Sequence, residues 1–247
     1  MSAAVDIAPL LDRGRWTGYQ KFLTALTALA VIFDGFDIQI LGFAIPSLMK
    51  EWGVARTVFG PVLALGLAGM AVGSPVAGYF GDRYGRRPAL IGCMLLFGSA
   101  TVATSLVNSV FALAALRFLT GVGAGGALPN AAALVAEFSP LRRRPLAVKL
   151  TIVCVPLGGM MGGLIAARIL PAMGWHALYQ VGGTLPLAFA AAIYALLPES
   201  PRFLVQSARS WLALEAMLAR MGRPVPAAAI SRIPASERCN CARRFAC

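Results

Sequence analysis

Residues 22–49 read FLTALTALAVIFDGFDIQILGFAIPSLM, an apolar run whose only charged residues are Asp34 and Asp37. A helix that crosses a bilayer needs about 20 mostly apolar residues, and this run is longer. A removable signal peptide has an apolar core of only about 7 to 15 residues, so the run is predicted to stay in the mature protein. The stretch therefore predicts a membrane-spanning helix near the start of the chain.

Further apolar blocks follow this one. They lie at approximately 58–80, 89–107, 110–137, 147–171 and 176–198. The composition also differs from that of a soluble domain, because 58% of the residues are hydrophobic and only 13% are charged. We therefore expect an all-α membrane protein with six transmembrane helices. With ten acids and one histidine, the chain offers few groups for a catalytic cleft, so we predict no enzyme, no cofactor and no metal site.

The blocks divide the chain into four parts. Residues 1–21 are expected to be a cytoplasmic lead, and residues 22–198 a six-helix transmembrane domain built as two inverted three-helix repeats. Residues 199–223 are predicted to begin a central cytoplasmic loop. Residues 224–247 are predicted to be disordered or translated out of frame. The cysteines of this tail lack a fourth ligand or a nearby histidine, so they do not predict a zinc site.

The net charge of +12 comes from basic residues placed between the blocks. Short cytoplasmic loops hold an excess of Lys and Arg. Basic residues precede the first block, separate the second from the third and the fourth from the fifth, and follow the sixth, whereas the other connections hold little beyond Lys50, Arg56 and Arg168. We therefore predict a multi-pass protein of the inner membrane with both termini in the cytoplasm, in contact with lipid and not with nucleic acid.

Asp34 and Asp37 stand where charge is expensive. Each charge near the bilayer centre costs about 2.5 to 3.5 kcal/mol on insertion scales. The two acids are three residues apart and so share a helix face, with Gly35 between them expected to loosen the backbone. They are predicted to meet water, protons or a cation; the less favoured interpretation is that they pair with a basic residue to hold the bundle.

Arg117 is the candidate partner at the same depth. Counting about 1.5 Å per residue places it about 10 Å below the outer surface, where Asp34 and Asp37 also fall. Its guanidinium can hold an Asp of the first helix in a permanent pair, or it can bind an anionic substrate. The sequence leaves these two roles open.

Other features of the blocks concern packing and helix ends. Glycines four residues apart, such as Gly69 with Gly73 and Gly121 with Gly125, predict close helix contacts. We expect Pro46 and Pro61 to mark helix ends. Asn130 and Glu137 lie toward the cytoplasmic end of the fourth block, where Glu137 is either a gate salt bridge or a solvated carboxylate.

Residues 78–87 read GYFGDRYGRR, between the second and third blocks. This G-x-x-x-D-R-x-G-R-R pattern resembles the signature loop of the major facilitator superfamily of secondary transporters. The stretch from Arg117, RFLTGVG, resembles the fourth-helix motif of that family, and residues 198–202, PESPR, resemble its stretch after the sixth helix. The fold that the resemblance implies is the N-terminal half of a major facilitator transporter.

A narrower resemblance is to the aromatic acid:proton symporters. Their first helix carries D-G-x-D, here residues 34–37, and their fourth helix carries the arginine motif followed by P-N and later a Glu. The resemblance implies proton-coupled uptake of benzoate-type or hydroxybenzoate-type anions. It gives the proton coupling or substrate cavity to Asp34, Asp37, Arg117 and Asn130. It gives the cytoplasmic gate to Gly78, Asp82, Arg83, Gly85, Arg86, Arg87 and Glu137.

One departure from the family is large, because the family has twelve helices in two halves and six are predicted here. We expect a truncated N-terminal half that ends by a frameshift or a mispredicted gene end, which reading the downstream DNA in all frames would test. A half-transporter completed by a second copy is the alternative. An inactive fragment, a non-transporting membrane protein, and a porter for sugars or other metabolites also stay open.

Overall fold

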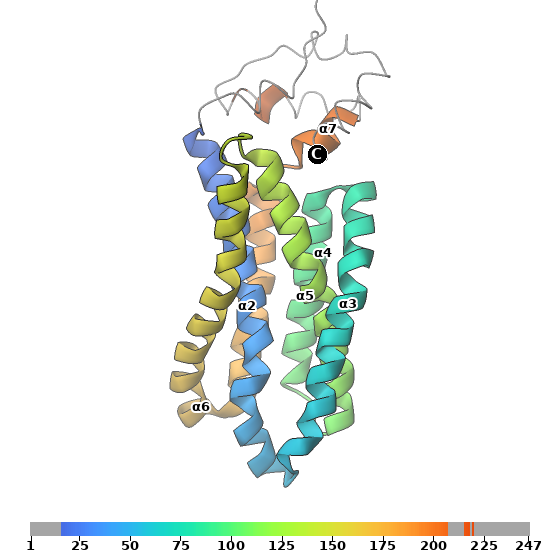
Figure 1. Ribbon diagram of the computed structural model, residues 1–247. Coiled ribbons are helices and arrows are strands. Elements are labelled where there is room, and N and C mark those ends of the chain that lie inside the picture. Colours follow the sequence, from blue (N-terminus) through green and yellow to red (C-terminus); the bar gives the residue numbers. More distant parts are fainter. Residues whose placement is uncertain (1–15, 207–214, 218, 220–247) are drawn as a thin grey trace, which may run out of the picture.

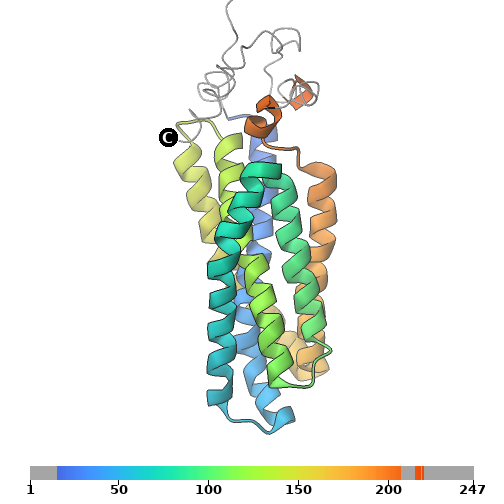
Figure 2. The same cartoon turned by 90° about the vertical axis from the view of Figure 1, so that its right-hand side faces the viewer.

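A bundle of long apolar helices makes up the described part of the chain. The computed structural model describes residues 16–206, 215–217 and 219, and all regular structure in these ranges is helical. The helices are α2 (Gly18–Trp52), α3 (Phe59–Tyr84), α4 (Arg86–Thr104), α5 (Val110–Phe138), α6 (Arg144–Leu196) and α7 (Pro201–Gln206), with a 3₁₀ turn η1 (Arg56–Val58). Figures 1 and 2 show the long helices running side by side along one axis.

The helix α6 is two membrane helices in one. Five of the described helices are long and apolar enough to cross a membrane, and α6 is the longest of them. At Gly174 its backbone leaves the helical region, with φ of 75° and ψ of −178°, a conformation that essentially only glycine adopts. Figure 1 shows α6 descending in yellow and returning in orange. The six spans predicted from the sequence are therefore confirmed, with the reversal between 171 and 176 as expected.

The first membrane helix is longer than predicted at both ends. It begins after Thr17, whose hydroxyl oxygen accepts a hydrogen bond from the Gln20 backbone N–H at 3.4 Å while the Gln20 side chain accepts one from the Thr17 N–H at 3.0 Å. This reciprocal pair is a capping box. At the other end α2 continues through Pro46 to Trp52, so the expectation that Pro46 ends the helix was wrong; membrane helices tolerate an internal proline. Pro61 does lie in the first turn of α3.

Glycines allow the helices to approach closely, as predicted. A Cβ built on Gly73 would lie 2.0 Å from the Val122 carbonyl oxygen in α5, and one on Gly121 would lie 2.2 Å from the Gly66 carbonyl oxygen in α3. Gly35 has the same role between α2 and α6, because a Cβ there would lie 1.9 Å from the Val155 carbonyl oxygen. The helix is continuous through Gly35, so the expected loosening of the backbone was wrong: the missing side chain serves packing.

Two apolar clusters fill the bundle, one toward each end. We call the end that carries residues 83–87 and 139–143 the basic end, and the opposite end, with the connection 53–58, the far end (Figures 1 and 2). Phe33 packs against the cluster toward the basic end, and Phe36 belongs to the cluster toward the far end. The two acids of α2 therefore lie in a polar layer between two apolar cores.

Some predictions fall wholly or partly outside the described residues. The lead 1–21 is described only from residue 16, and the loop 199–223 only at 199–206, 215–217 and 219. The tail 224–247, with its cysteines, lies outside.

Candidate functional site

Asp37 is held by side chains from two other helices. Thr101 of α4 donates a hydrogen bond to Asp37 Oδ1 at 2.7 Å, and Arg117 of α5 places its Nη1 3.3 Å from Asp37 Oδ2. Arg117 Nη2 also donates to the backbone carbonyl oxygens of Asp37, at 2.8 Å, and Ile38, at 3.2 Å. All three side chains are buried. The direct contact places Asp37 and Arg117 at the same level of the bundle, as the residue count predicted.

Asp34 has a different environment from Asp37. Its side chain is 1% exposed, and its Oδ1 has no hydrogen-bond partner among the described residues. Buried polar groups in folded proteins are normally hydrogen-bonded, so each exception asks for an explanation. The side chain lines a cavity of about 600 Å³ whose walls come from α2, α3, α5 and α6 and are largely apolar. The two acids of the D-G-x-D motif are therefore one paired carboxylate and one carboxylate with an unused oxygen.

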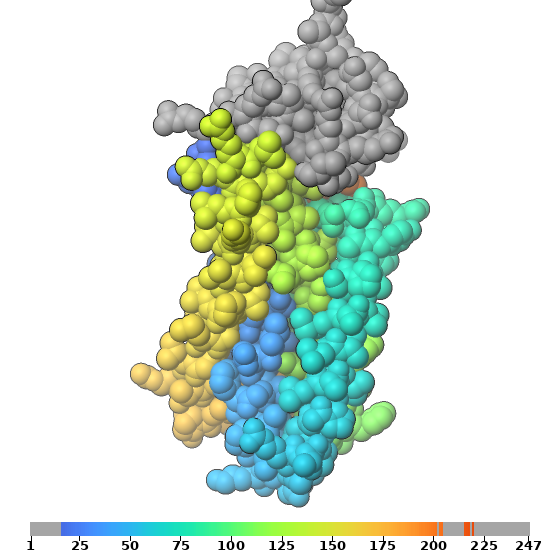
Figure 3. Space-filling model, in the orientation of Figure 1, coloured from blue at the N-terminus to red at the C-terminus, as the bar shows by residue number. Residues whose placement is uncertain are grey.

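A second cavity adjoins the first. It has a volume of about 290 Å³, is lined by Asp37 and Arg117, and shares Ile38, Met70 and Ala124 with the first. The helices that line the two cavities meet on the face seen in Figure 3, where α2 lies between α6 and α3. Asp34 therefore lines one of two neighbouring cavities, and Asp37 and Arg117 line the other.

Asn130 belongs to the basic end and is separate from the Asp37 contacts. Its side chain is fully buried, and its Nδ2 donates to the backbone oxygens of Ala77, at 3.2 Å, and Gly126, at 2.8 Å. Its Oδ1 accepts from Arg86 Nη1 at 3.3 Å. Asn130 therefore anchors Arg86 of the signature loop to α5, although the sequence resemblance assigned it to the substrate cavity.

The signature loop is held mainly by contacts around Arg86 and Arg87. Arg86 forms an ion pair with Asp82, whose side chain is 68% exposed. Gly85 has a φ of 110°, which a residue with a side chain rarely adopts, and it ends α3. Arg83 Nη1 lies 3.3 Å from the Tyr79 hydroxyl oxygen, and its guanidinium lies 5.8 Å from the centre of the Tyr84 ring. A Cβ at Gly78 would meet nothing within 4 Å, so the described residues give no packing reason for that glycine.

Glu199 completes the start of α4. Gly85, at the N-cap position of α4, has no side chain to cap the helix, and Glu199 Oε1 instead accepts a hydrogen bond from the Arg87 backbone N–H at 3.2 Å. The same oxygen accepts from the Ser200 backbone N–H at 2.9 Å. A carboxylate near a helix N-terminus is stabilised by the free N–H groups and the helix dipole. The P-E-S-P-R stretch therefore fastens the chain after α6 to the signature loop.

Glu137 lies buried at the end of α5, next to the same stretch. It accepts a hydrogen bond from the Ser200 hydroxyl. Arg144, at the start of α6, donates from Nε to the Ala136 carbonyl oxygen at 2.8 Å. The expected pairing of Glu137 with arginines of the signature loop stays a prediction.

Sequence reasoning missed several residues of these sites. Thr101 carries no motif signal, because a threonine in an apolar helix ordinarily bonds to its own backbone. The Tyr179 hydroxyl group is buried in the far-end cluster without a hydrogen-bond partner among the described residues, and it too carried no signal. Glu199 and Ser200 lie in the P-E-S-P-R stretch, which the sequence analysis identified, but neither residue was predicted to belong to a site.

Comparisons with known proteins agree with this architecture. A sequence profile for the Major Facilitator Superfamily matches residues 27–233. A gallate transporter of Pseudomonas putida is 37% identical over 222 residues, which cover 90% of this chain and 49% of the relative. The 4-hydroxybenzoate transporter PcaK of the same organism is 40% identical over 202 residues, covering 82% of this chain and 45% of the relative.

Solved structures share the fold at lower sequence identity. The xylose transporter XylE from E. coli, in a partially occluded inward-open conformation, superposes with a TM-score of 0.71 at 18% identity, covering 93% of this chain and 59% of that one. The chain spans about half the length of the curated relatives it matches.

Proposed function

Because this chain belongs to the major facilitator superfamily, we propose that it forms the N-terminal half of a proton-coupled transporter for aromatic carboxylates. Transporters of this kind hold their substrate near the bilayer midplane between two halves. The gallate and 4-hydroxybenzoate relatives carry aromatic acids, which supports this class of substrate. A second half, from a partner chain or a second copy, would close the cavities that α2, α3, α5 and α6 line.

The proposed orientation places the basic end in the cytoplasm. The arginines of residues 83–87 and 142–144 lie at the basic end, whereas Lys50 and Arg56 lie at the far end. Cytoplasmic loops carry the excess of positive charge in membrane proteins. The signature loop, the Glu199 cap and Glu137 then lie at the cytoplasmic mouth, where a gate would act.

Asp34 is the proposed site of the coupled proton, and its unpartnered oxygen is the observation that carries the proposal. A carboxylate in an apolar cavity loses much of its stabilisation by water. A proton removes that cost, because it neutralises the carboxylate without a cation. Binding and release of the proton would therefore follow the exposure of the cavity to one side of the membrane or the other.

Arg117 is the proposed contact for the substrate anion, and Asp37 is the group that positions it. Guanidinium groups bind carboxylates through paired N–H groups. Apart from Asp37 and Arg117 the cavity is apolar, with Leu63, Leu67 and Met70 among its lining, and such walls suit an aromatic ring. In this arrangement the substrate carboxylate would compete with the Asp37 carboxylate for Arg117.

Uptake of labelled 4-hydroxybenzoate and gallate by membrane vesicles tests the proposal. The chain is produced alone, and also together with the second half of the Pseudomonas putida gallate transporter. We expect uptake that requires a proton gradient in at least one case and that is lost in Asp34→Asn. Equal uptake by Asp34→Asn and the parent would refute the proton role, and absence of uptake by the parent in both cases would favour a non-transporting membrane protein.

A further inference from the structure

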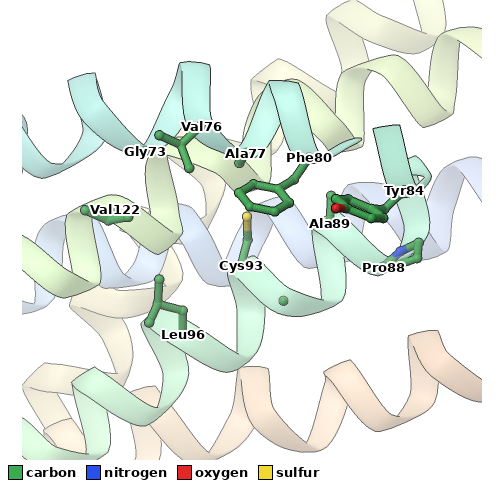
Figure 4. A pocket seen from close by; sticks show the side chains of 11 residues that line it. Gly73, Val76, Ala77, Phe80, Tyr84, Pro88, Ala89, Cys93, Leu96 and Val122 are labelled. Atoms are coloured by element: carbon green, nitrogen blue, oxygen red, sulfur yellow. The ribbon is translucent and has the colours of Figure 1, made fainter. Parts of the chain in front are cut away.

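A third cavity lies between α3 and α4 and reaches the end of α3 at Tyr84. It has a volume of about 500 Å³, within the range of about 300 to 1,000 Å³ that is usual for small-molecule sites. It shares no lining residue with the two cavities at Asp34 and Arg117. Figure 4 shows Phe80 of α3 facing Cys93 of α4, and Tyr84 of α3 beside Ala89 and Pro88 of α4. We call this cavity the α3–α4 groove.

The α3–α4 groove is apolar and opens toward the surroundings of the bundle. Val76 is 45% exposed, Phe80 49% and Tyr84 55%, and the rings of Phe80 and Tyr84 are stacked with their centroids 5.7 Å apart. Gly92 lies in its wall, and a Cβ there would meet nothing within 4 Å. In a membrane such a groove faces lipid. Binding of a lipid chain there is driven by van der Waals packing and not by the removal of apolar surface from water.

A positive charge without a carboxylate partner lies at the mouth of the α3–α4 groove. Arg83 lies over the Tyr84 ring and beside the Tyr79 hydroxyl, and neither contact neutralises it. The nearby carboxylate of Asp82 is paired with Arg86. Among the residues that the structure describes, no carboxylate forms an ion pair with Arg83. Its positive charge is therefore uncompensated where α3 ends.

We propose that the α3–α4 groove binds an anionic phospholipid, with one acyl chain between Phe80 and Cys93 and the phosphate at Arg83. Basic groups at the ends of membrane helices bind anionic headgroups in this way. Tyrosines are enriched at the membrane–water interface, where lipid headgroups lie. The positions of Tyr79 and Tyr84 beside Arg83 therefore fit the depth of a headgroup. The bound lipid would lie against the signature loop, so the loop would respond to the lipid composition of the membrane.

Photocrosslinking tests the site directly. The purified chain is placed in nanodiscs of phosphatidylcholine that contain phosphatidylglycerol with a photoactivatable diazirine in its acyl chain, and crosslinked peptides are mapped by mass spectrometry. We expect crosslinks to concentrate on residues 76–96. Gly92→Phe fills the groove and should remove most of them. Gly42→Phe is the matched control, because Gly42 is an exposed glycine of α2 that also has nothing within 4 Å.

The headgroup part of the proposal has its own readout. One basic residue near an anionic lipid is worth about 1 kcal/mol, so Arg83→Gln should reduce the preference for phosphatidylglycerol over phosphatidylcholine about fivefold. Crosslinks spread evenly over the helices, or equal in Gly92→Phe and Gly42→Phe, would overturn the site. If Gly92→Phe does not fold, competition decides: unlabelled phosphatidylglycerol should displace the probe from the parent chain, and failure to do so counts against the proposal.

Discussion

Arg117 binds both the carboxylate and the backbone of Asp37: Arg117 Nη1 lies 3.3 Å from Asp37 Oδ2, and Arg117 Nη2 donates to the Asp37 carbonyl oxygen at 2.8 Å. Thr101 binds the other carboxylate oxygen at 2.7 Å. These contacts join α2, α4 and α5 in the middle of the bundle. Asp34, one helical turn away, has an oxygen without such a contact in the described part of the chain. One short motif therefore supplies two carboxylates of different character.

Removing Arg117 should destabilise the bundle more than removing both charges. Loss of one partner from a buried ion pair costs about 3 to 5 kcal/mol, because the other charge is left without compensation. We expect Arg117→Gln to lower the thermal unfolding temperature in detergent by several degrees. Adding Asp37→Asn should restore part of the loss. Unfolding of the single and double variants, followed by tryptophan fluorescence, measures the coupling; strictly additive effects would contradict the pair.

Asp34→Asn should separate stability from transport. The substitution replaces a buried carboxyl group whose Oδ1 has no hydrogen-bond partner among the described residues. We therefore expect the unfolding temperature to be unchanged or slightly higher. Proton-driven accumulation of an aromatic acid should disappear, while exchange of labelled for unlabelled substrate should persist, because exchange needs no net proton movement. Loss of exchange together with accumulation would instead indicate that Asp34 binds the substrate.

Gly35→Ala should be poorly tolerated although it adds only a methyl group. That methyl would lie 1.9 Å from the Val155 carbonyl oxygen, so α2 and α6 must separate. Overpacking of this kind costs about 1 to 3 kcal/mol or more. Gly42→Ala is the control in the same helix, since nothing lies within 4 Å of its Cβ position. The yield of folded protein after gel filtration in detergent compares the two, and equal yields would contradict the close contact.

Glu199→Ala should loosen the start of α4. Loss of a helix cap costs about 0.5 to 2 kcal/mol, and here the cap comes from a residue beyond the end of α6. We expect faster amide hydrogen exchange at Arg86, Arg87 and Ala89, with no change in the middle of α4. Glu199→Gln keeps an oxygen acceptor and should restore part of the protection. Unchanged exchange in Glu199→Ala would show that the described contact contributes nothing to the helix start.

The sequence was sufficient to predict the six spans and the common level of Asp37 and Arg117. The thickness and apolar character of the bilayer set the length and hydropathy of a membrane-spanning helix. Spans can therefore be predicted without knowing how the helices pack against one another. Counting residues along two helices placed Asp37 and Arg117 at the same depth, but it left open whether Arg117 pairs with an Asp or binds a substrate anion. The place of Asn130 in the substrate cavity stays a prediction, and its contacts with Ala77 and Arg86 could not be predicted, because its rotational position on α5 depends on how α3 and α5 pack.

Other contacts were beyond the reach of sequence reasoning for the same reason. Thr101 binds Asp37 only because α4 packs beside α2 at that depth. The role of Gly35 was misjudged as flexibility, since a glycine that loosens a helix and a glycine that admits a neighbouring backbone look identical in sequence. Pro46 was misjudged because the rule that prolines end helices is weaker in lipid than in water.

The reversal at Gly174 has a consequence for how the protein enters the membrane. Because one non-helical residue separates the two halves of α6, they form a helical hairpin with almost no hydrophilic connection to carry across the bilayer. Its tip holds Trp175, which is buried and donates a hydrogen bond to Glu51 at the end of α2 at 2.6 Å. The two halves of α6 are therefore suited to insertion as one unit during synthesis, docking onto a first helix already in place.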